Sequence, residues 1–419
     1  MPSPLPASPQ QPASPYAAPQ AHHRGADSYQ WFIAGVATWF TAVGMQSVLF
    51  SWLVVGELHV EAEWVGVAQS ATMLPAVLLI LIGGAVADRH DRRSLLIGLH
   101  LLAALLSAGL VALVASAKLT LPRLLVYAVA AGSVQAFVMP ARDALLSEVA
   151  GPNLMRAVTG LTLVQWGTQA VGSLVAGAAR WVGTVPALCV HCLIVFSGVF
   201  PLRQLSPAPT GYGAGRRQLR LTEIVEGVQE VLHSPVLLPV FLLVTAVGIL
   251  FIGPFMVVFP ILVRDYYGGD IGQLALLNMM FPVGTILGSA GLLWYGQIRR
   301  KGAAQLGALV FGSCCLGVIA VGLPLWGTLV AGSAWGIGAA IFTNTGRTLF
   351  QEQAPPSHRA RVLSVYMFGF MGASGLIGAP LSGVLVAHVG PLATCAVASG
   401  VMLAVLVCTF LFTNVSRME

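Results

Sequence analysis

The sequence predicts an all-α integral membrane protein with twelve transmembrane helices arranged in two six-helix bundles. The first observation is composition: of 419 residues, 57% are hydrophobic and only 9% are charged, against about 25% charged in an average soluble domain. The second is that long stretches lack Asp, Glu, Lys and Arg. The third is that motifs of the first half recur in the second half. So much apolar surface excludes a soluble globular fold, because water-exposed surfaces need polar side chains.

The charge-free stretches mark the expected helices, since a helix needs about 20 mostly apolar residues to cross a bilayer. Eight stretches have single-span length: 28–56, 64–87, 94–117, 124–141, 157–179, 181–202, 231–263 and 271–298. Two longer stretches, 302–346 and 362–416, each fit two spans, with breaks expected near Pro324 and at Gly390-Pro391. Strands of a membrane barrel would instead show about ten alternating residues. The sum is twelve helical spans.

The segments around the helices define the expected domains. Residues 1–29 contain seven prolines among Ser, Ala and Gln, which predicts a disordered cytoplasmic tail or a segment for a proline-binding partner. Bundles at 30–202 and 234–413 follow, with a linker at 203–233 between them and a cytoplasmic tail at 414–419. Helical spacing of apolar residues in the linker predicts an amphipathic helix on the inner membrane surface: Leu221, Ile224, Val228 and Val231.

Basic residues predict the orientation, because Lys and Arg accumulate in short cytoplasmic loops. Seventeen of them fall on the side of both termini and four on the other side, which predicts cytoplasmic termini. This topology accounts for the net charge of +6 without a nucleic-acid partner. The excess of Arg over Lys fits a GC-rich genome, so the expected location is a bacterial cytoplasmic (inner) membrane.

Three motifs recur at nearly one offset. The pattern Gly84-x-x-x-Asp88-Arg89-x-x-Arg92-Arg93 recurs 207 positions later as Gly291-x-x-x-Tyr295-Gly296-x-x-Arg299-Arg300. The pair Gly172 and Gly177 recurs 206 positions later as Gly378 and Gly383. Arg142, Glu148 and Pro152 correspond to Arg347, Glu352 and Pro356, at offsets of 205, 204 and 204. A repeat of a six-helix unit in one orientation is typical of secondary transporters, whose two halves rock about a central site.

Three segments carry a family resemblance. GGAVADRHDRRSLLIG resembles the loop between helices 2 and 3 of major facilitator superfamily transporters. MPARDALLSEVAGPNLMRAVTGL and EGVQEVLHSPVL are similar to the branch that contains the enterobactin exporter and the macrolide-efflux proteins. The resemblance covers residues 29–413 and implies alternating access, most often with export of an amphipathic compound by a proton antiporter. The chain departs from that branch where Met45 follows Gly44, a position that commonly carries an acidic residue.

The candidate cytoplasmic gate is the first motif: Gly84, Asp88, Arg89, Arg92 and Arg93. Gly84 would let helix 2 approach a neighbour closely, and Asp88 would accept hydrogen bonds from arginines where the helix leaves the membrane. The resemblance implies that this aspartate contacts the start of helix 11. We expect a latch between the bundles worth about 0.3 to 2 kcal/mol; the alternative is that the arginines only set topology.

Two further groups follow from the repeat. The charges on the short cytoplasmic connections are expected to form bridges that break and remake during rocking, or else to be solvated loop charges: Arg142 with Glu148, and Arg347 with Glu352. Small residues and a proline in helices 5 and 11 are expected to act as hinge or packing positions: Gly172, Gly177, Gly378, Pro380 and Gly383.

The resemblance implies that helices 1, 4, 7 and 10 line the substrate cavity. Their larger or polar residues are the candidate contacts, although each could serve helix packing: Trp39, Gln46, Gln135, Met139, Phe251, Phe255, Trp335 and Asn344. Such a lining suits a bulky, mostly apolar ligand. Proton-coupled transporters usually keep an ionisable group in the membrane; with no acidic residue deep in a span, Glu57 and Asp143 are the candidates for proton coupling.

Motifs for other chemistry are missing. The sequence has no phosphate-binding loop, catalytic triad or metal-hydrolase motif, so we predict no enzyme, no ATP and no cofactor. Cys189, His191 and Cys192 would be an incomplete set for a tetrahedral metal, so we predict no metal site. The leading hypothesis is an exporter of drugs, siderophores or metabolites. The alternatives are a lysophospholipid or lipid flippase, with Arg180 or Arg264 at the cavity mouth, and a transport-inactive membrane scaffold or sensor.

Overall fold

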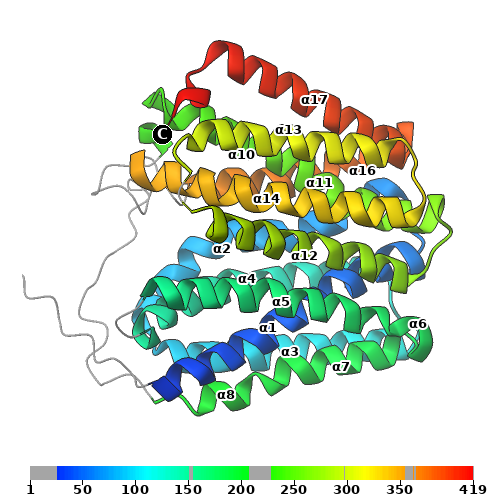
Figure 1. Ribbon diagram of the computed structural model, residues 1–419. Coiled ribbons are helices and arrows are strands. Elements are labelled where there is room, and N and C mark those ends of the chain that lie inside the picture. Colours follow the sequence, from blue (N-terminus) through cyan, green and yellow to red (C-terminus); the bar gives the residue numbers. More distant parts are fainter. Residues whose placement is uncertain are drawn as a thin grey trace, which may run out of the picture.

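The computed structural model describes residues 26–150, 154–206, 228–296, 298–353, 362 and 365–418. Within these ranges every regular element is helical, which confirms the all-α expectation. The long helices lie side by side with roughly aligned axes (Figure 1). The first half of the chain forms one bundle and the second half forms another, stacked against it in the view of Figure 1.

The N-terminal bundle comprises α1 (Ala26–Trp52) with the π-helical turn η1 (Leu53–Glu57), α2 (Ala62–Arg89), α3 (Arg92–Ala115), α4 (Leu121–Val149), α5 (Leu154–Gly177), α6 (Ala179–Val182), α7 (Thr184–Ser197) and α8 (Val199–Arg203). Local chemistry sets several of these ends. Asp91 caps α3, its carboxylate accepting a hydrogen bond from the Ser94 amide at 2.9 Å. Gly183 separates α6 from α7 with a φ of +90°, a conformation that glycine adopts without steric cost.

The C-terminal bundle comprises α10 (Leu237–Val247), η2 (Gly248–Ile252), α11 (Gly253–Ile261) and η3 (Leu262–Tyr266) in one continuous rod, then α12 (Ile271–Tyr295), α13 (Lys301–Ala320), α14 (Leu325–Gln353), η4 (Phe368–Gly372), η5 (Ser374–Gly378), α16 (Ala379–Val389), α17 (Pro391–Phe412) and the short 3₁₀ turn η6 (Val415–Arg417). The two double-length stretches break where the sequence predicts. One break falls just before Leu325, and the other at Gly390, whose φ is +83°.

Eleven helices in the described part of the chain are long and apolar enough to cross a membrane: Ser28–Glu57, Ala62–Ile80, Arg92–Ala115, Leu121–Val149, Thr184–Arg203, Leu237–Tyr266, Ile271–Tyr295, Lys301–Ala320, Leu325–Phe350, Val365–Val389 and Pro391–Phe412. The helix α5 has 24 residues but is less apolar, because Gln165, Thr168 and Gln169 interrupt its hydrophobic sequence. A membrane protein with many helical spans is thus confirmed, and the count of twelve stays a prediction.

The bundles meet through two helix pairs. From the N-terminal bundle, α5 packs along α12 and α2 packs along α16, and α5 and α12 can be followed side by side in the middle of Figure 1. In the numbering of spans, these pairs join the fifth with the eighth and the second with the eleventh. Exchange of the two halves maps one pair onto the other, which gives the sequence repeat a spatial counterpart.

Several predicted boundaries need correction. The helix α4 runs to Val149, eight residues beyond the predicted stretch 124–141, because its charged residues pair with neighbours and do not end the helix. The helix α1 begins at Ala26, inside the segment 1–29 assigned to a tail. Of the tail predicted at 414–419, residues 414–418 fold back onto α13, where the Gly302 amide donates to the Met418 carbonyl at 3.1 Å. Of the predicted linker helix, Leu221 and Ile224 lie outside the described residues, while 228–233 are helical.

Candidate functional site

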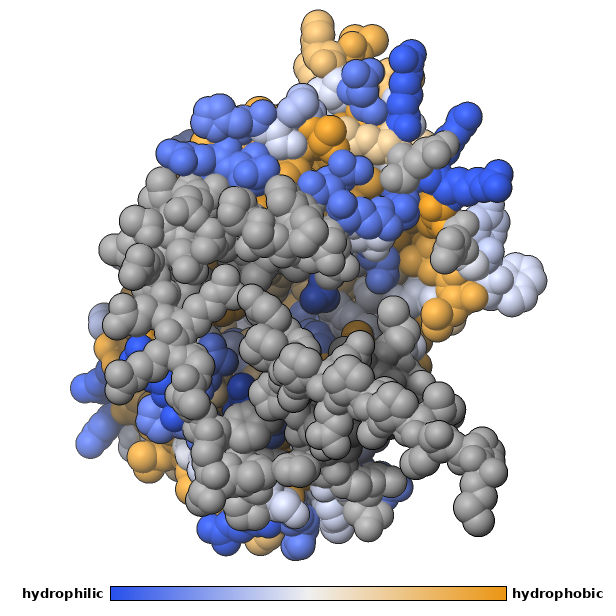
Figure 2. Space-filling view, turned by 90° about the vertical axis from the view of Figure 1, so that its left-hand side faces the viewer, coloured by the Kyte–Doolittle hydropathy of each residue, from blue (hydrophilic) through white to orange (hydrophobic). Residues whose placement is uncertain are grey.

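The bundle has two ends with different chemistry. We call the end that carries Arg92, Arg93, Arg203, Lys301 and Arg347 the arginine-rich end; both described chain ends lie there, at the left of Figure 1. The other we call the opposite end. Figure 2 looks onto the arginine-rich end, where many of the coloured residues are hydrophilic.

At the opposite end, polar contacts join the two bundles. Arg180 of α6 lies 3.5 Å from the carboxylate of Asp270, which caps α12. The guanidinium of Arg264 in η3 donates to the Val55 carbonyl of η1 at 3.0 Å. Nearer the middle of the bundle, the Ser47 hydroxyl of α1 donates to the Asn278 side chain of α12 at 3.3 Å. These contacts hold the opposite end closed.

The predicted glycine pairs lie at close helix contacts. A Cβ placed on Gly177 would be 2.7 Å from the Ala275 Cβ of α12, and one on Gly383 would be 2.6 Å from the Ala62 carbonyl oxygen of α2. Both contacts join the two bundles. The other member of each pair packs within its own bundle. Gly172 faces the Thr41 carbonyl of α1, and a Cβ on Gly378 would be 2.8 Å from the Gly248 carbonyl oxygen.

The region around Pro380 differs from a simple proline kink. Pro380 lies in the first turn of α16, and two π-helical turns, η4 and η5, come before it. Such turns place the extra residue outside the regular ladder and are frequent at functional sites. Any bend in this span therefore has more than one source.

The gate motif lies at the arginine-rich end. The carboxylate of Asp88 is 68% exposed and lies 3.7 Å from Arg92. Arg89 is exposed, and Arg93 donates to the Leu202 and Arg203 carbonyls at 3.1 and 2.8 Å. Residues 354–361, 363 and 364, which precede the described part of the eleventh span, lie outside the described residues. The latch between Asp88 and helix 11 therefore stays a prediction.

The close helix approach predicted for Gly84 falls at Gly83 instead. A Cβ on Gly84 would meet no atom within 4 Å, whereas one on Gly83 would clash with the Ala136 carbonyl of α4. Adjacent helical residues point about 100° apart, because a turn holds 3.6 residues. The motif thus places Gly84 beside the packing face.

The predicted charge pairs are wrong, because all four residues belong to helices and not to loops. Arg142 and Glu148 lie in α4, and Arg347 and Glu352 lie in α14. Residues five or six apart point to different faces of a helix, whereas side chains three or four apart meet. Glu148 is buried and instead forms an ion pair with Arg92 of α3.

The second bundle repeats that arrangement. Lys301 at the start of α13 lies 2.8 Å from Glu352 near the end of α14, as Arg92 at the start of α3 pairs with Glu148 near the end of α4. Arg347 is exposed. One sequence signal would have found these pairs. A basic residue stands at the start of the third span, Arg92, and another at the start of the ninth span, Lys301. Each pair joins helices of the same bundle.

Arg142 is held inside the N-terminal bundle. Its guanidinium lies 2.6 Å from Asp143, donates to the Gln165 side chain of α5 at 3.1 Å, and lies 5.2 Å above the Phe40 ring. The side chain is only 9% exposed.

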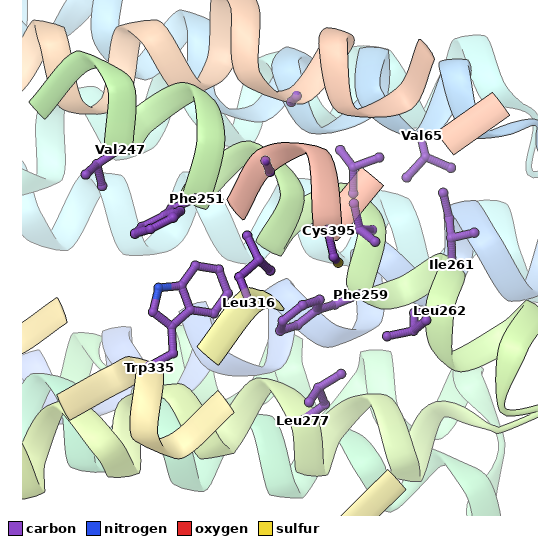
Figure 3. Close-up of a cluster of buried hydrophobic side chains, with 14 of the residues drawn as sticks. Val65, Val247, Phe251, Phe259, Ile261, Leu262, Leu277, Leu316, Trp335 and Cys395 are labelled. Carbon is purple, nitrogen blue, oxygen red and sulfur yellow. The ribbon is translucent and has the colours of Figure 1, made fainter. Parts of the chain in front are cut away.

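Aromatic side chains cluster inside the C-terminal bundle. Phe251 and Phe255 have ring centroids 5.3 and 6.1 Å from Trp335, and Figure 3 shows Phe251, Trp335 and Phe259 around a common centre. Three of the predicted cavity residues, Phe251, Phe255 and Trp335, thus come together. Sequence reasoning missed Phe259, which follows at the same four-residue spacing, and Phe281, whose centroid is 6.0 Å from Trp335.

One aromatic contact joins the two bundles, because the ring centroids of Trp166 in α5 and Phe281 in α12 are 6.4 Å apart. Phe251, Phe259 and Trp335 are buried, whereas Phe255, Phe281 and Trp166 are partly exposed. The partly exposed rings form the side of the cluster that faces the bundle interface. A flat apolar ligand can stack on such a surface.

The remaining candidate cavity residues lie elsewhere. Trp39 donates to the Gln135 side chain at 3.2 Å inside the N-terminal bundle, and Gln46 lines a separate small cavity. Met139 is partly buried, and Asn344 is exposed and donates to the Ala340 carbonyl at 2.8 Å. The predicted cavity residues therefore do not gather at one site.

The two candidates for proton coupling are both exposed. Glu57 accepts a hydrogen bond from Thr184 at 2.6 Å at the opposite end, and Asp143 is 59% exposed beside Arg142. At the same opposite end, burial raises the pKa of Tyr267 above its ordinary value of 10.0. Its hydroxyl donates to the Leu323 carbonyl at 2.7 Å.

The residues that suggest a metal do not converge. In the described ranges, no three His, Cys, Asp or Glu side chains gather at one point. Cys189 is exposed, Cys192 donates to the Ala104 carbonyl at 3.3 Å, and His191 is buried.

A sequence model described as the Major Facilitator Superfamily matches residues 32–368 and 255–419. The chain is 22% identical over 349 residues to the staphyloferrin A transporter of Staphylococcus aureus (strain NCTC 8325 / PS 47), which covers 80% of this chain and 83% of that protein.

Solved structures share the fold at low identity. The nucleoside transporter NupG superposes with a TM-score of 0.75 at 12% identity, covering 92% of this chain and 99% of its own. A POT family transporter in complex with 5-aminolevulinic acid gives 0.70 at 15% identity, covering 94% and 98%. A bacterial homologue of the human lysosomal transporter Spinster, inward-facing and unoccupied, gives 0.65 at 14% identity, covering 94% and 97%.

Proposed function

Because the chain belongs to the Major Facilitator Superfamily, we propose that it is a secondary active transporter that exports an amphipathic small molecule from the bacterial cytoplasm by alternating access. In this proposal the arginine-rich end faces the cytoplasm, as the distribution of basic residues predicts. Protons are the proposed coupling ion, which makes the protein an antiporter.

One observation carries the proposal. Contacts between the bundles gather at the opposite end, as in the Arg180–Asp270 pair, whereas the Arg92–Glu148 and Lys301–Glu352 pairs each stay within one bundle. Two bundles whose mutual contacts gather at one end correspond to one state of an alternating-access cycle. Separation of the bundles at the glycine contacts would open the opposite end.

The aromatic cluster supports an apolar part of the substrate. Phe255, Phe281 and Trp166 stand at the bundle interface with partly exposed rings, where ligands of transporters bind near the middle of the membrane. The relative named a staphyloferrin A transporter makes siderophore-like metabolites one class to test. Asp88 forms its latch, in this proposal, when the arginine-rich end closes.

The experiment is accumulation in inverted vesicles that contain the full-length protein. Lipophilic cations, macrolides and siderophores are offered with and without a proton gradient. Wild type is compared with Asp88→Asn and with the matched control Asp91→Asn, an acid-to-amide change three residues away that keeps the helix cap, since Asn is also a good N-cap. We expect gradient-dependent accumulation in wild type and control and its loss in Asp88→Asn. No accumulation of any probe would refute the export proposal.

The alternatives have less support. A lipid flippase needs a free positive charge at the cavity mouth, but Arg180 pairs with Asp270 and Arg264 pairs with Asp265. Uptake of a fluorescent lysophospholipid would nevertheless identify that function. A scaffold acting through the tail would lose its phenotype on deletion of residues 1–25, whereas an exporter should keep most of its activity.

A further inference from the structure

A coupled proton needs an ionisable group inside the membrane, and two histidines occupy such positions. His100 in the middle of α3 and His191 in the middle of α7 are each 2% exposed. Acidic side chains of the described residues, by contrast, lie near helix ends, as Glu57 and Glu148 do. Sequence reasoning considered acids alone and passed over the histidines.

The surroundings of His100 define its protonation chemistry. Its Nδ1 lies 2.8 Å from the Leu96 carbonyl oxygen one turn earlier, so Nδ1 carries the hydrogen and donates. Its Nε2 is buried and has no hydrogen-bond partner among the described residues. The carbonyl of Gly35 on α1 also faces the ring. A neutral His100 therefore keeps an unused lone pair on Nε2, beside an acceptor that would stabilise an added hydrogen.

The ring borders a small internal cavity between α1, α3, α4 and α8. Its walls include His100, Trp39, Phe40 and Arg142, and it has room for about one water molecule. The guanidinium of Arg142 also lies 2.6 Å from the carboxylate of Asp143, which is exposed. The same guanidinium donates to Gln165 of α5 at 3.1 Å, and α5 packs along α12 of the other bundle.

We propose that Nε2 of His100 is the binding site for the coupling proton, and that Arg142 and Gln165 transmit its charge to the bundle interface. A proton from water adds to the Nε2 lone pair and yields an imidazolium that donates to the Leu96 and Gly35 carbonyls. Its positive charge repels the Arg142 guanidinium across the cavity and disturbs the Arg142–Gln165 hydrogen bond. Release of the proton to water restores the neutral ring. The inference rests on the proposed transport function and gives it a coupling site.

Other charges around His100 are accounted for. The elements packed around this part of the bundle are α1, α2, α4, α7 and α8. Together with Asp91, Arg92 and Arg93 at the start of α3 itself, the described titratable and charged groups are Tyr29, Glu57, Glu63, Asp88, Arg89, His90, Arg123, Tyr127, Arg142, Asp143, Glu148, Cys189, His191, Cys192 and Arg203. Within this set, Arg142 is the group that lines the cavity with His100. The electrostatic response should therefore run through Arg142.

The first test measures protonation without any substrate. Trp39 has its ring centroid 4.9 Å from that of His100, and an imidazolium quenches a neighbouring indole more strongly than a neutral imidazole does. The emission difference between the wild-type protein and Trp39→Phe isolates Trp39 from the other tryptophans. We expect one protonation step as the pH falls below about 7, its loss in His100→Gln, and its retention in the matched control His191→Gln.

A second variant distinguishes loss of the protonation step from misfolding. His100→Asn keeps a donor for the Leu96 carbonyl but cannot bind a proton in this range, so it should fold and lack the step. A step that persists in both His100 variants, or a flat wild-type titration, would overturn the proposal. The export proposal would survive that result, because another coupling ion would serve it, and failure of the vesicle assay would leave this titration unchanged.

The second test measures transmission to the bundles. Spin labels at Ser147→Cys and Thr348→Cys, in a background that lacks the native cysteines, report the separation of α4 and α14 at the arginine-rich end. We expect the distance distribution to change with pH in wild type and in His191→Gln and to be independent of pH in His100→Gln. Gln165→Leu should keep the Trp39 step and lose the distance change. Protonation without a distance change in wild type would overturn the coupling role.

Discussion

Gly383 offers a direct test of how the opposite end closes. An alanine there would place its Cβ 2.6 Å from the Ala62 carbonyl oxygen and 3.1 Å from the Glu63 Cα. Both atoms belong to the backbone at the start of α2, which cannot yield without moving the helix. Overpacking of this kind costs about 1 to 3 kcal/mol. The cost applies to the closed arrangement and is relieved when the bundles separate, so Gly383→Ala should favour the conformer that is open at the opposite end by about 5- to 150-fold.

The assay is the distance between spin labels at Ser116→Cys and Val321→Cys, exposed positions at the opposite end of each bundle. Gly383→Ala should enrich a longer distance. Gly400→Ala is the matched control, because a Cβ there meets no atom within 4 Å and the gain in helix propensity is the same. Identical distributions for both variants would refute the idea that Gly383 sets the closed contact.

Three further predictions concern single side chains, each read out in purified protein in detergent. Glu148→Gln removes the charge of a buried carboxylate that pairs with partly buried Arg92 and should lower the free energy of unfolding by about 1.5 to 3 kcal/mol, measured by chemical denaturation; a loss below about 1 kcal/mol would contradict a stabilising pair. Trp335→Ala removes the centre of the aromatic cluster and should cost about 3 to 5 kcal/mol, seen as a lower Tm, whereas exposed Asn344→Ala should stay within about 0.5 kcal/mol. Arg180→Gln breaks a half-exposed bridge between the bundles and should change stability by at most about 1 kcal/mol; a larger loss, or one insensitive to salt, would mean that the bridge is shielded from solvent.

The relation between the two bundles gives these tests a common meaning. Substitutions at the Arg92–Glu148 pair act within one bundle and should affect stability more than the balance between conformers. Substitutions at Gly177 and Gly383 act between bundles and should affect that balance more than stability. A transporter needs rigid bundles and an adjustable interface, because coupling requires two discrete arrangements of packed elements.

The sequence by itself determined the membrane class, most of the span positions and the internal repeat. These features depend on local properties: runs of apolar residues set the spans, and Gly390 breaks one double stretch through its positive φ. The repeated glycines Gly177 and Gly383 were found from spacing alone, and they lie at equivalent contacts of the two halves.

Only the tertiary structure decided which side chains meet. Glu148 pairs with Arg92 and not with Arg142, and Gly83 instead of Gly84 faces a neighbouring helix. It also decided that His100 lines a cavity together with Arg142, and that its Nε2 is buried without a hydrogen-bond partner among the described residues. Hydropathy reports whether a segment is apolar, but contacts depend on how far each helix is rotated and shifted against its neighbours. A change of one residue in a helix turns a side chain by about 100°, so partners across helices follow from packing alone.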